Sequence, residues 1–136
     1  MAVLSARITP HLSPPKVCLT YNMWLASSRV GSVLGPSDYL WFYDQVKSTG
    51  PWNYKKSVSK DFEDFGNFNY GATGTAMGVP ENVLLRAAGW AQSRAGTSAQ
   101  AFREWYTGAP YGDDPKDQFQ IKRGIQYAKQ NGYPRR

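Results

Sequence analysis

The sequence predicts a mostly α-helical fold: a single compact helical domain with a glycine-rich central segment. Its 136 residues are the length of one ordinary domain, and 41% hydrophobic residues suffice to bury one core. Several stretches carry helix start and stop signals, whereas no long stretch alternates apolar and polar residues as a half-buried strand would. The α+β alternative adds a minor β-hairpin around residues 52–62.

The N-terminal segment differs in composition from the rest of the chain. We expect residues 1–18 to form a flexible arm or linker and residues 19–133 to form the domain itself. Prolines lack a backbone donor and bias the preceding residue away from helix. This segment contains three of them, at Pro10, Pro14 and Pro15.

Two helices are expected in the first third of the domain. Apolar residues recur at a weak helical spacing over residues 20–34, and Gly35-Pro36 ends the pattern. Ser37 is then a suitable N-cap for a second helix over residues 38–47, because its hydroxyl can accept the free N–H groups of a first turn.

The central segment leaves two alternatives open. Residues 52–60 have no clear period and predict a loop or a short strand, and the aromatic and acidic run 61–71 follows. A glycine series runs through the next part, at Gly66, Gly71, Gly74 and Gly78. In a helix the last three share one face, where another backbone could approach closely, whereas in a loop they permit positive φ.

Two later helices have clear boundaries. Pro80 and Gly96 delimit a helix over residues 80–95, and Asp114 followed by Pro115 starts the last helix, which runs to about Gln130. The first should bury Val83, Leu84, Ala87, Ala88, Trp90 and Ala91, and the last should bury Phe119, Ile121, Ile125 and Ala128.

The charge of the chain favours an anionic partner. The net charge is +6, and residues 1–60 hold 7 basic and 2 acidic side chains. Nucleic acid is the first candidate, with a cell-wall polymer or an acidic protein behind it, although the charge could serve solubility alone. No apolar run approaches the roughly 18 residues of a membrane span, and the start has no signal-peptide layout.

Histidine and cysteine chemistry is poorly supported. His11 is the only histidine and lies in the proline-rich segment. The domain itself therefore has no histidine to act as the base of a Ser-His-Asp triad or as the ligand of a histidine metal site. Cys18 is the only cysteine, which excludes an intrachain disulfide, and a lone cysteine is usually a small buried hydrophobe. Carboxylates are therefore the best catalytic candidates.

The carboxylates form two clusters along the chain. Asp61, Glu63 and Asp64 lie among phenylalanines, which could raise the pKa of one acid while a neighbour stays ionised. Asp113 and Asp117 flank Asp114, and the sequence does not show whether the two clusters meet. The catalytic candidates are Glu63, Asp64, Asp113 and Asp117.

A bound cation and a structural role are alternatives for the same carboxylates. Asp64, Asp113 and Asp117 could hold Mg²⁺ or another divalent cation, since oxygen ligands suit these ions. Capping of the last helix is the structural alternative for Asp114 above all, and also for Asp117.

Candidate substrate-binding residues combine basic, aromatic and amide side chains. Cations can meet phosphates, while flat rings stack on bases or on sugar rings. The aromatic residues considered for stacking are Trp52, Tyr54, Tyr70 and Tyr111, although a domain of this size must bury most of its aromatic rings. The substrate-binding candidates are Lys55, Asn67, Asn69, Tyr70, Arg86, Gln92 and Tyr111.

Ordered sequence blocks over residues 38–130 carry a resemblance to a known family. They are WFYDQV (41–46), GPWNYK (50–55), EDFGNFNYGATG (63–74), LLRAAGWAQ (84–92) and PYGDDPKDQ (110–118). Together these blocks resemble the polymorphic toxin type 44 domain. The chain departs from the family pattern at Asn53, where the pattern has Asp.

The resemblance implies an antibacterial effector domain, delivered as part of a larger secreted protein into a target cell and neutralised by a cognate immunity protein. It implies no chemistry. The leading hypothesis is a nuclease of the RNase type, acting in the target cytoplasm through Asp64, Asp113 and Asp117, with Lys55 or Arg86 on phosphate. The alternatives are a peptidoglycan-cleaving glycosidase in the periplasm, with Glu63 as proton donor, and a non-catalytic basic binding module.

Overall fold

The computed structural model describes residues 6–94, 108, 111 and 113–135, and within them the fold is all-helical. The chain forms α1 (Leu19–Arg29), α2 (Pro36–Val46), α3 (Tyr54–Ser57), the 3-10 helix η1 (Lys60–Phe62), α4 (Glu63–Met77), α5 (Glu81–Arg94) and α6 (Pro115–Gln130). The described residues contain no strand. The predicted mostly α fold is confirmed. Among the described residues, no helix has the length and apolar composition of a membrane span.

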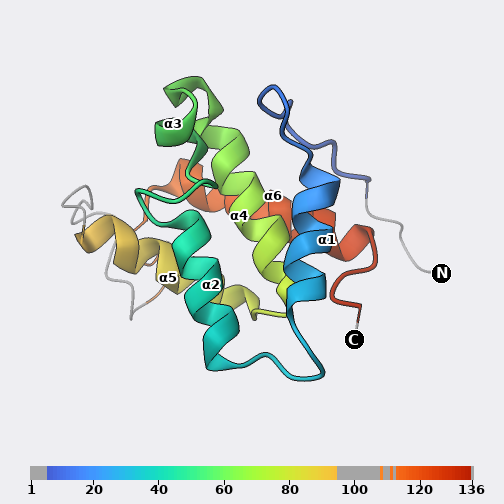
Figure 1. The fold of residues 1–136 in the computed structure, drawn as a ribbon. Helices are drawn as coiled ribbons and strands as arrows, with labels where there is room; N and C mark the ends of the chain where they lie inside the picture. The colour runs from blue at the N-terminus through green and yellow to red at the C-terminus, as the bar shows by residue number, and fades with distance from the viewer. Residues whose placement is uncertain (1–5, 95–107, 109–110, 112, 136) are drawn as a thin grey trace.

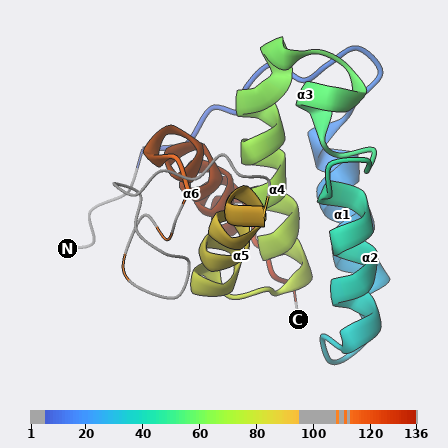
Figure 2. The ribbon, with the colours of Figure 1, turned by 90° about the vertical axis from the view of Figure 1, so that its left-hand side faces the viewer.

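The central helix is α4, which lies between α1 and α2 on one side and α5 and α6 on the other (Figure 2). The sequence left open whether its glycines lie in a helix or in a loop. They are helical up to Gly78, which ends α4 at a φ of 97°, a value that glycine adopts without steric cost. The glycine-rich central segment therefore forms the central helix of the domain.

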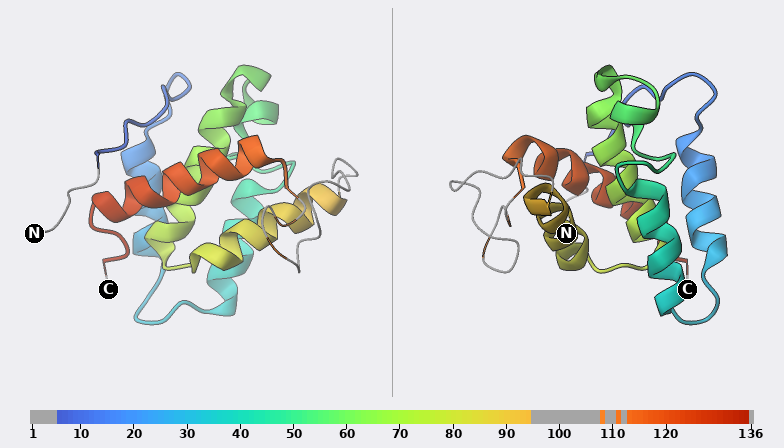
Figure 3. Two further views of the ribbon diagram at one scale, coloured as in Figure 1. Left: turned by 180° about the vertical axis from the view of Figure 1, so that it is seen from behind. Right: turned by 60° about the vertical axis from the view of Figure 1, so that its left-hand side comes forward.

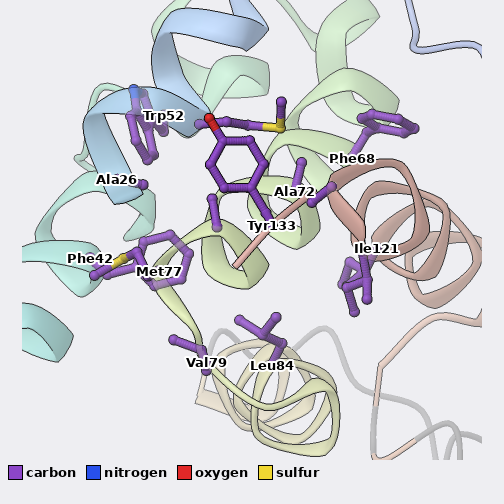
Figure 4. Close-up of a cluster of buried hydrophobic side chains, with 14 of the residues drawn as sticks. Ala26, Phe42, Trp52, Phe68, Ala72, Met77, Val79, Leu84, Ile121 and Tyr133 are labelled. Atoms are coloured by element: carbon purple, nitrogen blue, oxygen red, sulfur yellow. The ribbon is translucent and has the colours of Figure 1, made fainter. Parts of the chain in front are cut away.

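The crossing of α4 and α6 depends on two glycines, and Figure 3 shows α6 running across α4. A Cβ added to Gly71 would overlap the backbone carbonyl of Ile121, and one added to Gly124 would overlap that of Phe68. Because neither residue has a side chain, the two backbones pack directly on each other. Around this contact the core includes the buried side chains of Phe68 and Ile121 (Figure 4). Ile125 is buried as well.

The alternative of a β-hairpin at residues 52–62 is wrong. Backbone N–H groups of Lys56 and Ser57 donate to the carbonyl of Asn53, which starts α3. The hydroxyl of Ser59 accepts from the N–H of Asp61 and starts η1. Local caps and turns therefore satisfy this backbone without a partner strand.

The second helix begins earlier than predicted. Gly35, and not Ser37, is the N-cap, and Pro36 occupies the first helical position. Asp38 reaches back, and its Oδ2 accepts from the N–H of Gly35 at 2.9 Å. The Asp38 carboxylate thus satisfies the N–H of the N-cap residue, whereas the sequence assigned the N–H groups of the first turn to the Ser37 hydroxyl.

The predicted inward faces of α5 and α6 are only partly correct. Leu84, Ile121, Ile125 and Ala128 are buried, as expected. Leu85, which was not on the predicted face of α5, is buried too. The exposed members of the two predicted faces are Val83, Ala87, Trp90, Ala91 and Phe119.

Residues 6–11 of the segment predicted to be a flexible arm contact α6 and α4. The N–H of Ile8 donates to Gln130 Oε1 at 2.8 Å, and Arg123 Nη2 donates to the carbonyl of Thr9 at 2.8 Å. His11 packs edge-on against Phe68. Cys18 is exposed and caps α1 by accepting from the N–H of Tyr21, so its expected burial is wrong.

Candidate functional site

Carboxylates from the two predicted clusters meet where the first turn of α4 approaches the first turn of α6. Glu63 is the first residue of α4, and Asp113 and Asp114 directly precede α6. The charges of all three act on Asp117 in the first turn of α6, and each raises its pKa. We call Glu63, Asp113, Asp114 and Asp117 the carboxylate cluster.

Asp117 has the most unusual acidity in the cluster. Burial, followed by the charges of Asp113, Glu63 and Asp114, raises its pKa from 3.8 to about 7, and the charge of Lys55 opposes the shift. Its Oδ1 accepts from Asn67 Nδ2 at 3.1 Å, one turn along α4 from Glu63. Close to neutral pH this carboxyl is therefore part protonated and able to give up a proton.

Asp113 is held beneath the surface and is only 3% exposed. Its Oδ1 accepts from the N–H of Asp114 and its Oδ2 accepts from Gln118 Nε2, both at 2.9 Å. Burial raises the pKa of Asp113, while these two hydrogen bonds and the charge of Lys55 lower it. With both oxygens engaged, Asp113 is placed to act on its neighbours through its charge.

Asp114 caps α6, as its sequence position predicts. Its Oδ1 accepts from the N–H of Lys116 at 2.9 Å, and Pro115 takes the first helical position. The N–H of Asp114 also donates to Gln92 Oε1 at 2.7 Å. Gln92, a predicted substrate-binding residue, thus ties the end of α5 to the turn that carries Asp113.

Gln118 is part of the site, although no sequence pattern pointed to it. It is 4% exposed, and its Nε2 donates to Asp113 Oδ2 and also to the carbonyl of Leu85 at 3.3 Å. Its Oε1 has no hydrogen-bond partner. A glutamine in the second turn of a helix is usually exposed, so only its contacts reveal its place below the cluster.

Two other predicted binding residues turn out to have internal partners. The hydroxyl of Tyr70 donates to the carbonyl of Leu84 at 2.6 Å, and burial followed by the charge of Asp113 raises the pKa of this phenol. Asn69 is buried on the side of α4 that faces α1, where its Oδ1 accepts from Asn22 Nδ2. The same Asn22 amide donates to the hydroxyl of Tyr54, so Asn69 belongs to the core.

The basic and aromatic candidates are divided between the surface and the core. Lys55 is exposed on α3 and acts on both Asp113 and Asp117 through its charge. The Arg86 guanidinium lies 4.7 Å from the ring centre of Tyr111, whose φ of 61° is unusual for a residue with a side chain. Trp52 and Tyr54 are buried and unavailable for stacking.

Asp64 lies apart from the carboxylate cluster. It is exposed and lines an open hollow on the outer side of α6, together with Pro115, Lys116, Phe119 and Gln120. Asp61 is likewise exposed, on η1. Among the described residues no three acidic, histidine or cysteine side chains are arranged to hold a metal ion, and the predicted divalent cation at Asp64, Asp113 and Asp117 stays a prediction.

Comparison with known proteins identifies the family. The family model described as bacterial toxin 44 matches residues 47–130, from the C-cap of α2 to the last residue of α6, and so includes the whole carboxylate cluster. Neither the curated proteins nor the solved structures contain a significant match. The family match covers more than half of the chain, and the chain therefore belongs to the bacterial toxin 44 family.

Proposed function

We propose that this toxin domain is a carboxylate-dependent glycosidase that cleaves the glycan strands of peptidoglycan. The observation that carries the proposal is the acidity of Asp117. Its pKa is about 7, and the charge of a second carboxyl group, Glu63, acts on it. Glycoside hydrolysis needs an acid that is protonated near neutral pH and a second carboxyl group close to it. The roles differ from the sequence hypothesis, which made Glu63 the proton donor.

The local charge supports an uncharged scissile group. Asp117 is surrounded by the charges of three acidic residues and one lysine. Such a field repels a phosphodiester, whose transition state gains further negative charge, but it stabilises the positive charge that develops on a sugar ring during cleavage. The electrostatics of the cluster therefore favour a glycosidic bond over a phosphodiester bond.

The overall charge of the chain is compatible with the same substrate. A net charge of +6 attracts the domain to anionic polymers, and bacterial walls are anionic even though the glycosidic bond is not. The basic surface and the acidic site then have separate tasks. The surface concentrates the enzyme on the wall, and the site performs the chemistry.

The reaction follows from the two roles. Protonated Asp117 transfers its proton to the glycosidic oxygen as the bond between that oxygen and the anomeric carbon breaks. Glu63 completes the reaction as the base that deprotonates an attacking water or as the nucleophile of a glycosyl ester that water then hydrolyses. In both cases water adds to the anomeric carbon, and a new reducing end forms.

The test is release of reducing ends from purified peptidoglycan sacculi. Wild-type protein should release them, and Asp117→Asn should lower the rate at least about 100-fold because the amide cannot donate a proton in this way. Asp61→Asn is the matched control: it removes the same charge from an exposed position on η1. No release by the wild type, or full activity of Asp117→Asn, would contradict the proposal.

The nuclease hypothesis is the second candidate, and a basic rim favours it. Lys55, Lys56 and Lys60 are all exposed on α3 and η1, and the charge of Lys55 acts on Asp113 and Asp117 of the cluster. A nuclease should kill when expressed in the cytoplasm and should degrade RNA or DNA there. A glycosidase should kill only when it is exported to the periplasm, where we also expect its immunity protein to act. The two patterns of killing separate the candidates.

A further inference from the structure

We propose that the open hollow beside Asp64 binds a sugar ring of the glycan next to the bond that is cleaved. We call it the Phe119 hollow; its lining is Asp64, Pro115, Lys116, Phe119 and Gln120. The inference rests on the proposed glycosidase function and adds to it a binding subsite outside the carboxylate cluster.

Phe119 supplies the main argument. Its side chain is 60% exposed in the second turn of α6, on a helix whose two isoleucines, Ile121 and Ile125, are buried. Exposure of a phenylalanine costs the stabilisation that burial would give, and packing gives no reason for it here. A flat exposed ring is the surface on which the apolar face of a sugar stacks.

Polar side chains at the rim complete the character of a sugar site. The exposed Asp64 carboxylate can accept hydrogen bonds from sugar hydroxyl groups, and Gln120 Nε2 can donate hydrogen bonds to them. Gln120 is held in place, because its Oε1 also meets His11 Nε2 and accepts from Arg123 Nη1 at 3.2 Å. The hollow measures about 390 Å³, within the usual range of small-molecule sites.

The hollow adjoins the catalytic residues in both helices. Asp64 follows Glu63 in α4, and Lys116 precedes Asp117 in α6. Successive residues of a helix point about 100° apart, so the hollow and the cluster lie on adjacent sides of the same two turns. A glycan strand that passes over the first turn of α6 can therefore occupy the hollow while its next linkage reaches Asp117.

The experiment compares KM and kcat on soluble glycan strands. Phe119→Ala should raise KM about five- to twentyfold and change kcat less than twofold, because the lost contact binds substrate and transition state alike. Phe119→Trp should restore KM, since a larger ring stacks as well. The matched control is Trp24→Ala, which removes an exposed aromatic ring from α1 and should leave KM unchanged.

The outcomes are distinguishable. An unchanged KM for Phe119→Ala, in a protein that cleaves glycan strands normally, overturns the subsite and leaves the glycosidase intact. Equal KM increases for Phe119→Ala and Trp24→Ala would also overturn it, because binding would then depend on exposed aromatics in general. A wild type that releases no reducing ends would overturn the glycosidase and, with it, the subsite that rests on it.

Discussion

The helices α4 and α6 meet in two regions with opposite chemistry. At their crossing, Gly71 and Gly124 have no side chains and the two backbones touch. At their first turns, carboxylates are brought together at the cost of raising the pKa of Asp117 to about 7. The crossing stabilises the fold, and the first turns hold charges that water would solvate better.

The contrast explains how the site persists. Carboxylates that repel one another would separate if the helices were free to shift. The glycine contact allows very little shift, because two backbones in direct contact cannot slide without losing packing on both sides. The crossing thus fixes the positions of the helix starts.

The largest effect is expected at the crossing. Gly124→Ala should lower the free energy of unfolding by about 3 kcal/mol or more, because the new Cβ would overlap the carbonyl of Phe68. Denaturant unfolding measures it. The control is Gly66→Ala in α4, where the nearest atom lies 3.8 Å from the new Cβ and helix propensity favours alanine by about 0.5–1 kcal/mol. Equal losses for both variants would contradict a specific backbone contact.

The opposite sign is expected at the cluster. Asp117→Asn should raise the free energy of unfolding at pH 8 by about 1–3 kcal/mol, because the folded wild type must ionise a carboxyl whose pKa is raised from 3.8 to about 7. The introduced amide can still accept from Asn67. The folded state binds the extra proton only between these pKa values, so the wild type loses stability as pH rises from about 4 to 7. Unfolding at pH 4 and pH 8 should show the gain only at the higher pH.

A smaller loss is expected for the residue beneath the cluster. Gln118→Ala removes the donor to Asp113 Oδ2 and should cost about 1–2 kcal/mol at pH 8. Gln118 lowers the pKa of Asp113, so its removal penalises the ionised form, and the loss should shrink in acid. Gln126→Ala changes an exposed glutamine of the same helix and serves as control. A loss that does not vary with pH would show that Gln118 only fills space.

The smallest effect concerns the acidity of the proton donor. The charge of Lys55 lowers the pKa of Asp117. Lys55→Ala should therefore move the alkaline limb of the pH-activity profile to higher pH, by about a few tenths of a pH unit. Lys56→Ala is the control. Lys56 is also exposed on α3, but it is not among the charges that act on Asp117. A shift of equal size for Lys56→Ala would point to general surface charge instead.

Elements with local signals were predictable from the sequence. Asp114 and Pro115 mark the start of α6 because cap and first-turn chemistry depend on adjacent residues only. The turns of α3 were missed because a four-residue helix is too short to show a period. Residues 52–62 combine aromatic residues with small polar ones, which suit a strand as well as a turn.

The candidate site was predicted in its parts but not as a whole. The sequence identified Glu63, Asp113 and Asp117 by residue type, yet fifty residues separate Glu63 from Asp113. Their meeting depends on the glycine crossing, which is a tertiary contact. The same limit explains why Gln118 was missed and why Phe119 was placed in the core: a helical period gives spacing, but it does not define which side faces the neighbours.

The core network of Asn22, Tyr54 and Asn69 extends beyond the boundaries of the family match. Asn22 belongs to α1, upstream of the family match over residues 47–130, and donates to residues inside it. Tyr133, downstream of the match, is buried as well. The stretch that the family model matches is thus shorter than the packed unit to which Asn22 and Tyr133 belong. Recombination that exchanged only the matched stretch would separate Asn69 and Tyr54 from the amide of Asn22.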